Sequence, residues 1–445
     1  MSKRTTVTRR RFMRDMAAIG ATITFLPRGL RAANLNGKIN LATVGIGGMG
    51  ADDRAELVKH PAINIVALCD VNRNVLNQVG SEFPNAQKFE DFRQMFDKMG
   101  DKIDAVHIAT PDHMHAPIAM MAIMAGKHVY CQKPLTHEVD EARKLTLAAR
   151  QKGVVTQMGI QIHSTSFYRN AVAIIQSGAI GKVKEVHSWS NKTWGYEGDL
   201  PTNTTQPPAH LNWDAWVGVA PMRPYAPGHY AEGGNWRKWY DFGAGTMGDM
   251  GIHILDPVAA ALELTSPRTI ISHSPPPFKH SFGIRNRVSY TFPATKYTVD
   301  DVKVTWYDGG YMPDTEGWPL PEGRRIPDQG SMFFGEKGAL LLPHIAAPLL
   351  LPVADFRGYN KYERQPNGNH WHLWVDAIRG EAKATANFDY AGPLTETLLL
   401  GVLSCRFPGQ ELKWDAKAMK FTNFSDANAL LKRPYRNGWK IPGLG

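Results

Sequence analysis

The chain has 445 residues, the composition of an ordinary soluble globular protein and a formal net charge of +10. Its length is too great for one average domain and predicts two, each able to bury its own core. Residues 1–33 hold eight basic side chains and one aspartate, which is +7, so only +3 remains for the rest of the chain. This distribution excludes the basic footprint of a nucleic-acid-binding protein.

The N-terminus has the pattern of a targeting segment. Residues 8–14 read Thr-Arg-Arg-Arg-Phe-Met-Arg, which matches a twin-arginine signal, and an apolar run over 16–26 and small residues near Ala33 follow. The apolar run is well short of the roughly twenty residues that cross a bilayer, so we expect no stable membrane anchor. The alternative is a disordered basic tail. We expect residues 1–33 to direct export by the twin-arginine machinery to the periplasm or the extracellular space.

A glycine-rich turn, Gly-Ile-Gly-Gly-Met-Gly at 45–50, follows the apolar run 39–44 and precedes an amphipathic stretch. Gly45 allows a tight turn, Gly47 lets the backbone approach a pyrophosphate, and Gly50 lets the helix pack close to the strand. The helix N-terminus then presents unpaired N–H groups to the phosphates. The alternative is an ordinary loop. We predict a dinucleotide site whose turn residues are Gly45, Gly47, Gly48, Met49 and Gly50.

The acidic residue Asp70 ends the next apolar run, 63–69, about twenty residues after the glycines. A carboxylate there accepts hydrogen bonds from a ribose 2′-hydroxyl and repels a 2′-phosphate, which favours NAD over NADP. Arg73 is close enough to accommodate a phosphate, so NADP stays open as the less favoured cofactor. Twin-arginine export carries folded proteins, which suits a protein that loads its nucleotide before it leaves the cytoplasm.

Strand-like and helix-like stretches alternate from residue 38 to about 160, the pattern of a parallel sheet with helices on both faces. We therefore predict an α/β Rossmann domain, a doubly wound parallel sheet, over 38–160. Helix 137–152 is expected to begin after Thr136 as N-cap and to end at Gly153. The predicted strands are 39–44, 63–69, 103–109, 128–131 and 154–159, and the clearest other helix is 115–125.

After residue 160 the chain becomes rich in turns, proline and tryptophan, with longer strand-like runs. We predict a second, α+β domain over 161–440, built on a large and mostly antiparallel sheet. Residues 197–235, with six prolines, are expected to form a long ordered excursion over the surface. The predicted strands are 182–191, 286–293, 301–307 and 331–342, and two helices near 369–379 and 391–405 are expected to pack back.

Lys133 stands in the motif Gln-Lys-Pro directly after a buried strand. In a doubly wound sheet this position lies at the carboxyl edge, where ligands bind. A partly desolvated lysine there is able to orient or deprotonate a hydroxyl. The alternative is a solvated lysine before a turn proline.

A second group of polar side chains lies in the stretch 243–256, where Asp249 and His253 are four residues apart. In a helix they would share one face, and a carboxylate beside an imidazole suits acid–base work on a substrate hydroxyl. The alternative is a surface pair on a helix. Pro257 has to be accommodated by a kink. We take Lys133, Asp249 and His253 as the candidate catalytic residues.

The segment Thr-Pro-Asp-His-Met-His at 110–115 follows the strand 103–109 and is expected near the cofactor, with Thr110, Pro111 and His115 as contacts. Its His-x-His pattern and that of 370–372 have no further ligand cluster to support a metal. The three cysteines have no metal-ligand spacing, and their odd number indicates no disulfide framework. No metal site is predicted.

Six tryptophans and four tyrosines crowd the stretch 187–240. Sugar rings stack on such side chains, so this density points to a carbohydrate ligand, although most of the rings are expected to be core anchors. The tryptophans are Trp189, Trp194, Trp213, Trp216, Trp236 and Trp239.

These motifs resemble those of the glucose-fructose oxidoreductase, inositol dehydrogenase and rhizopine catabolism (Gfo/Idh/MocA) family, and the resemblance covers residues 38–440. It rests on 45–50, 109–115, 132–134 and 248–253. It implies a nicotinamide site between the domains, Lys133 on nicotinamide and substrate, Asp249 and His253 on the substrate hydroxyl, and a homo-oligomer. Stretches 387–390 and 435–439 resemble a bacterial subgroup that often carries export signals. Gln132 is a departure, because many members have glutamate there.

The resemblance leaves three functions open. The first is an NAD-dependent oxidoreductase acting on the CH–OH group of a sugar, polyol or derivative. The second follows from export, since free NAD is scarce outside the cytoplasm. It is a two-substrate oxidoreduction on a tightly held NAD, or an NAD-retaining glycoside hydrolase, lyase or epimerase that passes through a transient keto sugar. The third is a non-enzymatic sugar-binding protein.

Overall fold

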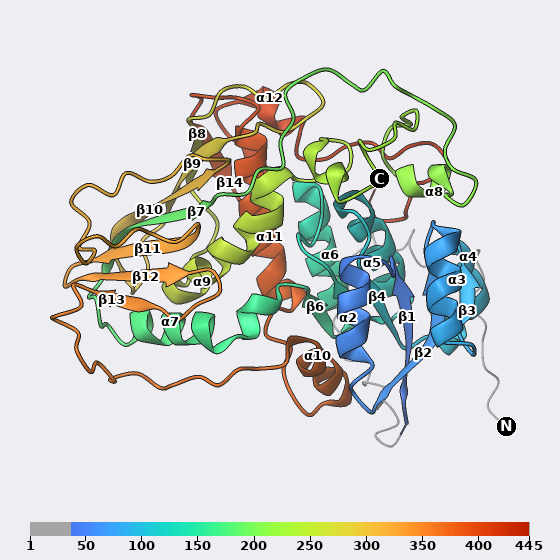
Figure 1. Cartoon of the computed structure of the whole chain (residues 1–445), viewed down its shortest axis with the longest axis horizontal. Coiled ribbons are helices and arrows are strands. Elements are labelled where there is room, and N and C mark those ends of the chain that lie inside the picture. The colour runs from blue at the N-terminus through green and yellow to red at the C-terminus, as the bar shows by residue number, and fades with distance from the viewer. Residues whose placement is uncertain (1–36, 445) are drawn as a thin grey trace.

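The computed structural model describes residues 37–444 and places two layered domains side by side (Figure 1). The targeting segment predicted over residues 1–33 lies outside these residues. The N-terminal domain holds a sheet of six strands in the order β3-β2-β1-β4-β5-β6, with every pair parallel. The strands are β1 (Ile39–Val44), β2 (Ile63–Cys69), β3 (Gln87–Phe89), β4 (Ala105–Ile108), β5 (His128–Cys131) and β6 (Thr156–Met158).

Helices cover both faces of this sheet. Successive residues of a strand point to opposite faces: Leu41 belongs to one buried cluster, with Leu57 and Leu76, and Ala42 to another, with Met95 and Met120. This confirms the predicted doubly wound sheet. The helices are α2 (Met49–Leu57), α3 (Arg73–Glu82), α4 (Phe92–Met99), α5 (His115–Met124) and α6 (Val139–Lys152).

The prediction that Thr136 caps α6 was wrong. The N-cap is Glu138, which forms a reciprocal capping box with Glu141, and the Glu138 N–H donates to Oε2 of Glu141 over 3.1 Å. The hydroxyl of Thr136 donates instead to the Glu138 carbonyl over 2.9 Å. The helix ends at Gly153 in a left-handed conformation, as predicted. Strands β4 and β6 are shorter than the runs 103–109 and 154–159.

The C-terminal domain is built on a nine-stranded sheet in the order β13-β12-β11-β7-β10-β9-β8-β14-β15. Only the pair of β7 with β10 is parallel, so the sheet is mostly antiparallel, as predicted. The strands are β7 (Val183–Ser190), β8 (Thr269–Ser272), β9 (Asn286–Phe292), β10 (Thr298–Asp308), β11 (Gln329–Gly335), β12 (Ala339–Pro343), β13 (Leu349–Leu351), β14 (Leu412–Asp415) and β15 (Lys420–Phe421).

The run 331–342, predicted as one strand, is a hairpin of β11 and β12. The chain turns between Gly335 and Gly338, where the Gly335 N–H donates to the Gly338 carbonyl over 2.8 Å. Residues 335–338 read Gly-Glu-Lys-Gly, a charged pair between two glycines that signals a turn, so the prediction of a single strand passed over a break that the sequence contains.

Helices lie between this sheet and the N-terminal domain. Helix α11 (Phe388–Ser404) packs on α6 (Figure 1). Between the two helices Arg143 binds Glu396 with two hydrogen bonds of 2.6 and 2.7 Å. The two domains therefore meet along a helix pair. The remaining α-helices within residues 37–444 are α7 (Ser166–Gln176), α8 (Trp213–Val217), α9 (Ile252–Leu262), α10 (His370–Arg379) and α12 (Ser425–Asn428).

The stretch around Asp249 and His253 is not one regular α-helix. Residues Met247–Gly251 form a π-helical turn, and α9 begins at Ile252 and continues through Pro257 to Leu262. The wider turn changes the angular spacing between positions 249 and 253. The spacing argument for a shared helix face therefore does not apply here.

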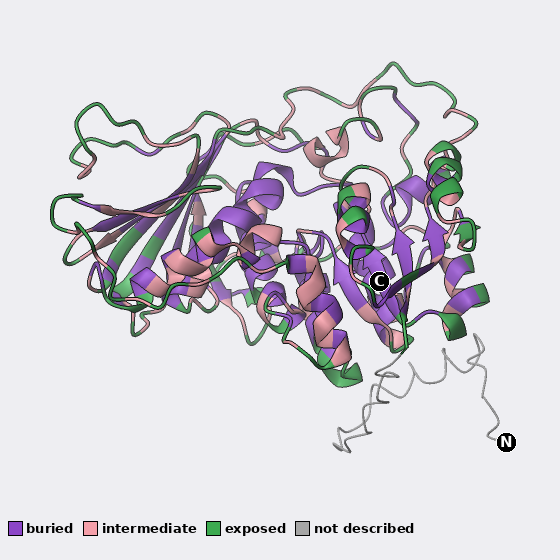
Figure 2. Ribbon diagram, turned by 60° about the horizontal axis from the view of Figure 1, so that its bottom comes forward, coloured by how far each residue is buried: buried purple, intermediate pink, exposed green. Residues whose placement is uncertain are grey.

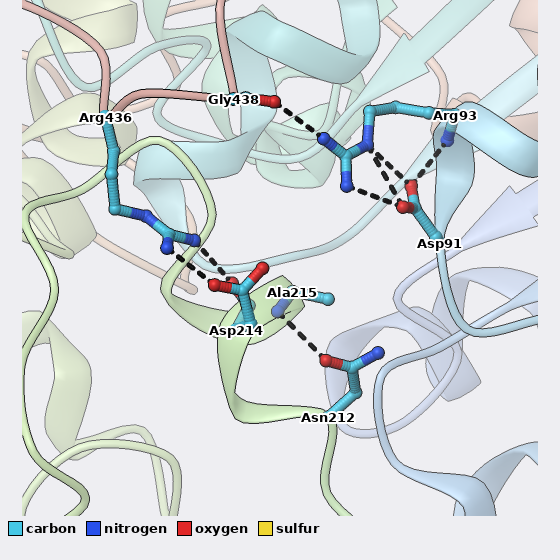
Figure 3. A network of polar contacts seen from close by, with 7 residues as sticks. All are labelled: Asp91, Arg93, Asn212, Asp214, Ala215, Arg436 and Gly438. Atoms are coloured by element: carbon cyan, nitrogen blue, oxygen red, sulfur yellow. Dashed lines mark hydrogen bonds and ion pairs between the residues drawn. The ribbon is translucent and has the colours of Figure 1, made fainter.

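Two segments of the C-terminal domain reach across to the N-terminal domain. The excursion after β7 arches over to α8, as Figure 1 shows. The C-terminal tail holds Trp439 between two guanidinium groups, Arg93 at 3.8 Å and Arg436 at 5.4 Å from the ring centre. Arg93 donates to the Gly438 carbonyl and Arg436 to Asp214 (Figure 3). These contacts fix the tail and the excursion on the α4 side of the parallel sheet.

Figure 2 shows the burial that results: the strands of the parallel sheet are buried, whereas α3 and α4 at its edge expose their outer faces. Of the helices within 37–444, none has the length and apolar character required to cross a membrane.

Candidate active site

The glycine turn lies at the point where the strand order reverses, between β1 and its neighbour β4. Gly45 has φ of 77°, and a Cβ there would lie 2.7 Å from the Ala109 carbonyl carbon. A Cβ at Gly50 would lie 2.0 Å from the Gly45 carbonyl oxygen. At Gly48 nothing lies within 4 Å of the Cβ position, and within residues 37–444 no side chain caps α2. The Gly50 and Ala51 N–H groups donate to the Gly47 and Gly48 carbonyls over 2.9 Å. The start of the helix is nevertheless open to a pyrophosphate, which would meet the positive end of the helix dipole.

Asp70 fastens the end of β2 to this turn. Its Oδ2 accepts the Ile46 N–H and its Oδ1 the Asn72 N–H, each over 2.9 Å. Burial raises the pKa of Asp70, and these amides oppose the shift. A carboxylate has about four acceptor positions, so capacity remains for a ribose hydroxyl.

Arg73 is engaged by the excursion. Its backbone N–H donates to the His210 carbonyl over 2.8 Å, its guanidinium donates to the Ala209 carbonyl, and it forms an ion pair of 3.6 Å with Glu90. The guanidinium is thus directed toward these partners at the edge of the predicted adenosine site.

His115 joins the loops that follow β4 and β5. Its ring nitrogens lie 2.7 Å from the Pro134 carbonyl and 2.8 Å from the Thr110 carbonyl, and burial lowers its pKa to about 4. Pro111 precedes a 3-10 turn, Asp112–Met114. The Thr110 hydroxyl is buried without a hydrogen-bond partner among the described residues. Such an orphaned group beside the glycine turn fits a bound dinucleotide.

Lys133 and Asp249 form the centre of the site. The Lys133 ammonium donates to Oδ1 of Asp249 over 2.6 Å and to the Asp249 carbonyl over 2.9 Å. Lys133 comes from the loop after β5 and Asp249 from the π-helical turn, so the pair joins the two domains. The structure thus brings together two residues that the sequence separates by 116 positions.

Asp249 collects further donors on its other side. Trp194 Nε1 donates to Oδ2 over 2.7 Å, Arg237 Nε lies 3.2 Å from Oδ1, and Lys192 Nζ lies 4.0 Å from Oδ2. Burial acts to raise the pKa of Asp249, but the charges of Lys133 and Arg237 outweigh it and hold the pKa well below its ordinary value. Asp249 is therefore an ionised anchor for cations.

His253 is buried beside this cluster and makes no hydrogen bond to Asp249. Burial, and then the charge of Lys133, hold its pKa well below the ordinary value, so the ring is neutral at pH 7. Its Nδ1 has no hydrogen-bond partner among residues 37–444, and the His344 ring lies 5.6 Å away, centre to centre. The Nδ1 atom of His344 lies 2.8 Å from the Tyr168 hydroxyl. Burial lowers the pKa of His344 to about 4.

The sequence pattern did not indicate Lys192, Arg237, His344 or Tyr168. In the sequence, Lys192 lies two residues before Trp194, and Arg237 directly follows Trp236. The density of aromatic residues in this stretch was the one sequence signal near the two cations. Four of the six tryptophans there are buried core residues, as expected for most of them: Trp189, Trp213, Trp216 and Trp239. Trp194 and Trp236 instead pack against the Arg237 guanidinium, 5.4 and 4.1 Å from it.

Histidines from both His-x-His patterns contact backbone and side-chain groups of the protein. His113 contacts the Phe242 and Trp216 carbonyls, and His370 contacts Ser164 and the Met158 carbonyl. The three cysteines are buried and unpaired. Within the described part of the chain, no group of three His, Cys, Asp or Glu side chains is placed to hold a metal ion.

Sequence profiles identify the class to which this arrangement belongs. The profile of the Gfo/Idh/MocA oxidoreductase family, NAD-binding Rossmann fold, matches residues 39–160, and that of the family's C-terminal alpha/beta domain matches residues 170–317. Together they cover more than half of the chain. The protein belongs to the Gfo/Idh/MocA oxidoreductase family, and its N-terminal domain is an NAD-binding Rossmann domain, as predicted.

Individual relatives are more distant. Levoglucosan dehydrogenase of Pseudarthrobacter phenanthrenivorans is 25% identical over 189 residues, which are 42% of this chain and 40% of that protein. Inositol 2-dehydrogenase of Rubrobacter xylanophilus is 32% identical over 154 residues, which are 34% of this chain and 44% of that protein. The chain thus matches less than half the length of either relative.

Among solved structures, the WlbA dehydrogenase of Chromobacterium violaceum in complex with NADH and UDP-GlcNAcA superposes with a TM-score of 0.63. The match covers 87% of this chain and 99% of that one at 14% identity. At this identity the likeness concerns the fold alone.

Proposed function

We propose that this protein is an NAD-dependent oxidoreductase acting on the CH–OH group of a sugar, polyol or derivative. The observation that carries the proposal is the Lys133–Asp249 contact of 2.6 Å, made between the domains and beside the neutral His253. Its position at the carboxyl edge of the parallel sheet supports the same conclusion, because ligands of such sheets bind there. Relatives that are dehydrogenases of levoglucosan and inositol also support it.

The residues divide the proton chemistry between them. NAD, when bound by the glycine turn, Asp70 and Thr110, supplies the acceptor for the two electrons of the alcohol. His253 is neutral and able to take the hydroxyl proton, while the Lys133 ammonium stabilises the negative charge that develops on the oxygen. Asp249 holds Lys133 in place and, being ionised and surrounded by cations, is a poor base.

Substitution of Lys133 tests this assignment. Lys133→Ala is expected to lower kcat by about 10²–10⁴-fold, the range for loss of an acid–base or charge-stabilising group. NAD affinity, measured by fluorescence titration, should stay within a few-fold of the wild-type value, because the glycine turn is untouched. Full activity of Lys133→Ala would contradict the assignment, and a non-enzymatic sugar-binding protein would show no turnover in either form.

We also propose a second candidate function, the NAD-retaining redox cycle of a hydrolase, lyase or epimerase. It is supported by backbone contacts that hold the excursion over the end of β2. Asn72 and Leu211 form a β-bridge, the Arg73 N–H donates to the His210 carbonyl, and the Asn212 N–H donates to the Val71 carbonyl over 2.8 Å. We call residues 206–212 the strap. A strap at the predicted adenosine site favours a cofactor that stays bound between turnovers.

Mass spectrometry of the nucleotide released on denaturing the purified protein separates the two candidates. NAD in stoichiometric amount, with sugar converted and no NADH released, supports the retained cofactor. Protein that is purified empty and reduces added NAD is an ordinary dehydrogenase, and the second candidate then fails.

Export and assembly are part of the proposal. The Arg9–Arg10 pair and the apolar run after it support delivery by the twin-arginine machinery to the periplasm or beyond. Replacement of both arginines by lysine should leave the protein in the cytoplasmic fraction, and unchanged export would contradict it. The resemblance to the family supports a homo-oligomer, which light scattering measures directly.

A further inference from the structure

The site contains more positive than negative charge. Three cationic side chains surround the Asp249 carboxylate: Lys133 at 2.6 Å, Arg237 at 3.2 Å and Lys192 at 4.0 Å. Trp194 donates a further hydrogen bond of 2.7 Å to the same carboxylate. Both Asp249 oxygens are therefore occupied, and three positive charges share one negative charge.

Two further titratable groups near the site, Asp112 and His253, do not cancel the excess. Asp112 is fully buried, and burial raises its pKa to about 7 even though the charges of Arg237 and Lys133 oppose the shift. It is therefore only about half ionised at neutral pH, and its Oδ2 accepts the Ala244 N–H over 3.1 Å. The low pKa of His253 leaves that ring neutral.

The excess charge lies toward solvent. Side-chain exposure rises from 8% for Asp249 and 11% for Lys133 to 24% for Arg237 and 48% for Lys192. Asp249 and Lys133 thus form the closed end of the site, and Arg237 and Lys192 the open end. A substrate whose hydroxyl reaches Lys133 extends past the other two cations.

The Arg237 guanidinium is positioned to bind a planar anionic group. Trp236 and Trp194 pack on its guanidinium, and its backbone N–H donates to the Gly234 carbonyl over 3.1 Å. Apart from the contact of its Nε with Asp249, its guanidinium makes no hydrogen bond or ion pair within residues 37–444. A guanidinium has five N–H donors, and its fork matches the oxygens of a carboxylate or a phosphate.

We infer that the substrate is an anionic sugar derivative, whose carboxylate or phosphate is bound by Arg237 and Lys192 while a ring hydroxyl meets Lys133 and His253. This inference rests on the proposed oxidoreductase function and names the substrate class of the same site. Trp194 and Trp236, beside Arg237, supply aromatic surface for the sugar ring. Arg237 and Lys192 are thus specificity-determining residues that need not touch the reacting carbon.

Direct binding to the NAD-saturated full-length protein tests the inference. Titration calorimetry would compare three sugar acids (D-glucuronate, D-galacturonate and D-gluconate) with D-glucose, D-galactose, myo-inositol and D-glucose 6-phosphate, and turnover would be followed for each. We expect the best acid to bind at least about tenfold more tightly than its neutral counterpart, with an affinity that falls as salt rises. Tighter binding of the phosphate ester instead would identify phosphate as the anionic group.

Variants assign the effect to the two cations. Arg237→Lys keeps the charge and loses the fork, and should lower the affinity for the acid by about tenfold or more. Lys192→Ala should lower it by about two- to fivefold, because this side chain is half exposed. In both variants the affinity for a neutral sugar should fall by less than the affinity for the acid, so that the preference for the acid decreases. Lys184→Ala, an exposed lysine at the other end of β7, is the matched control and should change nothing.

Failure of the inference and failure of the proposed function give different results. Neutral sugars that bind and react as well as the acids, with both variants affecting the two classes alike, would overturn the anionic substrate and leave the oxidoreductase intact. If none of the seven compounds binds or is converted, the anionic-substrate inference is overturned, and the lack of turnover counts against the proposed function as well.

Discussion

Gln132 donates a hydrogen bond from its side-chain amide to Oδ2 of Asp53 over 2.7 Å, and both side chains are buried. Trp371 Nε1 donates to Oδ1 of Asp53 over 2.8 Å, and His107 Nε2 lies 2.9 Å from Oδ2. The amide oxygen of Gln132 accepts the backbone N–H of Lys133 over 3.2 Å. Gln132 thus connects a buried carboxylate to the lysine at the centre of the site, and Asp53 explains why an amide suits position 132.

Gln132→Glu is expected to destabilise the protein by about 1–3 kcal/mol at pH 7, because it places a second carboxyl beside a buried one. Proximity to Asp53 raises the folded-state pKa of the introduced carboxyl above its unfolded value. The penalty is therefore absent below the unfolded pKa and grows as the pH rises through the folded-state value. Thermal unfolding between pH 4 and 8 measures it.

The double variant Asp53→Asn with Gln132→Glu is the control for this prediction. It removes the like charge and should recover most of the stability lost in the single variant. A penalty that is the same at pH 4 and pH 8, or that the double variant does not reduce, would show that repulsion from Asp53 is not its cause.

His253→Ala should lower kcat by about 10²–10⁴-fold with little change in NAD affinity, because it removes the neutral proton acceptor and leaves the Lys133–Asp249 contact in place. Because the folded-state pKa of His253 lies well below 6.5, its protonation should not reduce wild-type kcat/KM between pH 6 and 8. A loss of wild-type activity centred near pH 6.5, absent from the variant, would contradict the neutral assignment.

His163 and Asp256 predict a pH-dependent contribution to stability. His163 Nδ1 lies 2.9 Å from Oδ1 and 3.0 Å from Oδ2 of Asp256. Burial acts to lower the pKa of His163, but the charge and hydrogen bond of Asp256 outweigh it and raise the pKa. The stability gained is therefore complete below the unfolded pKa of about 6.5 and is lost as the pH rises through the folded-state value.

His163→Gln should consequently lower Tm more at pH 6 than at pH 9. Calorimetry of both proteins at the two pH values measures the difference. An equal decrease at both would mean that the imidazolium–carboxylate pair adds no pH-dependent stability.

The strap predicts slow release of NAD. The double variant Pro207→Gly, Pro208→Gly leaves every strap hydrogen bond in place. It increases the conformational entropy that the strap loses when it closes, and this weakens closure by about 0.4–1 kcal/mol for each substitution. NAD dissociation, followed by fluorescence after a chase, should become up to about tenfold faster. Pro201→Gly, in the same excursion but outside the strap, is the control. Equal dissociation rates in all three proteins would show that the strap does not retain the cofactor.

Local sequence chemistry determined much of this protein by itself. A side chain at position 45 or 50 would clash with the backbone of the turn or of the segment that follows the adjacent strand. The glycine pattern therefore predicted the turn without knowledge of the fold. Five of the six parallel strands and the position of Lys133 after β5 follow from short apolar runs and their boundaries. Such features depend on neighbours in sequence, and periodicity reports them.

Only the tertiary structure decided what surrounds Asp249. Lys192 lies between β7 and the excursion, Arg237 lies just after the excursion, and His344 follows the end of β12, far from His253 in sequence. No periodicity connects these residues, because their proximity depends on how the sheet and the two domains pack. Because Met247–Gly251 form a π-helical turn, the i, i+4 spacing of a regular α-helix does not describe how Asp249 and His253 are placed. Local chemistry thus predicted the glycine turn of the Rossmann domain, whereas long-range packing formed the charged surroundings of Asp249.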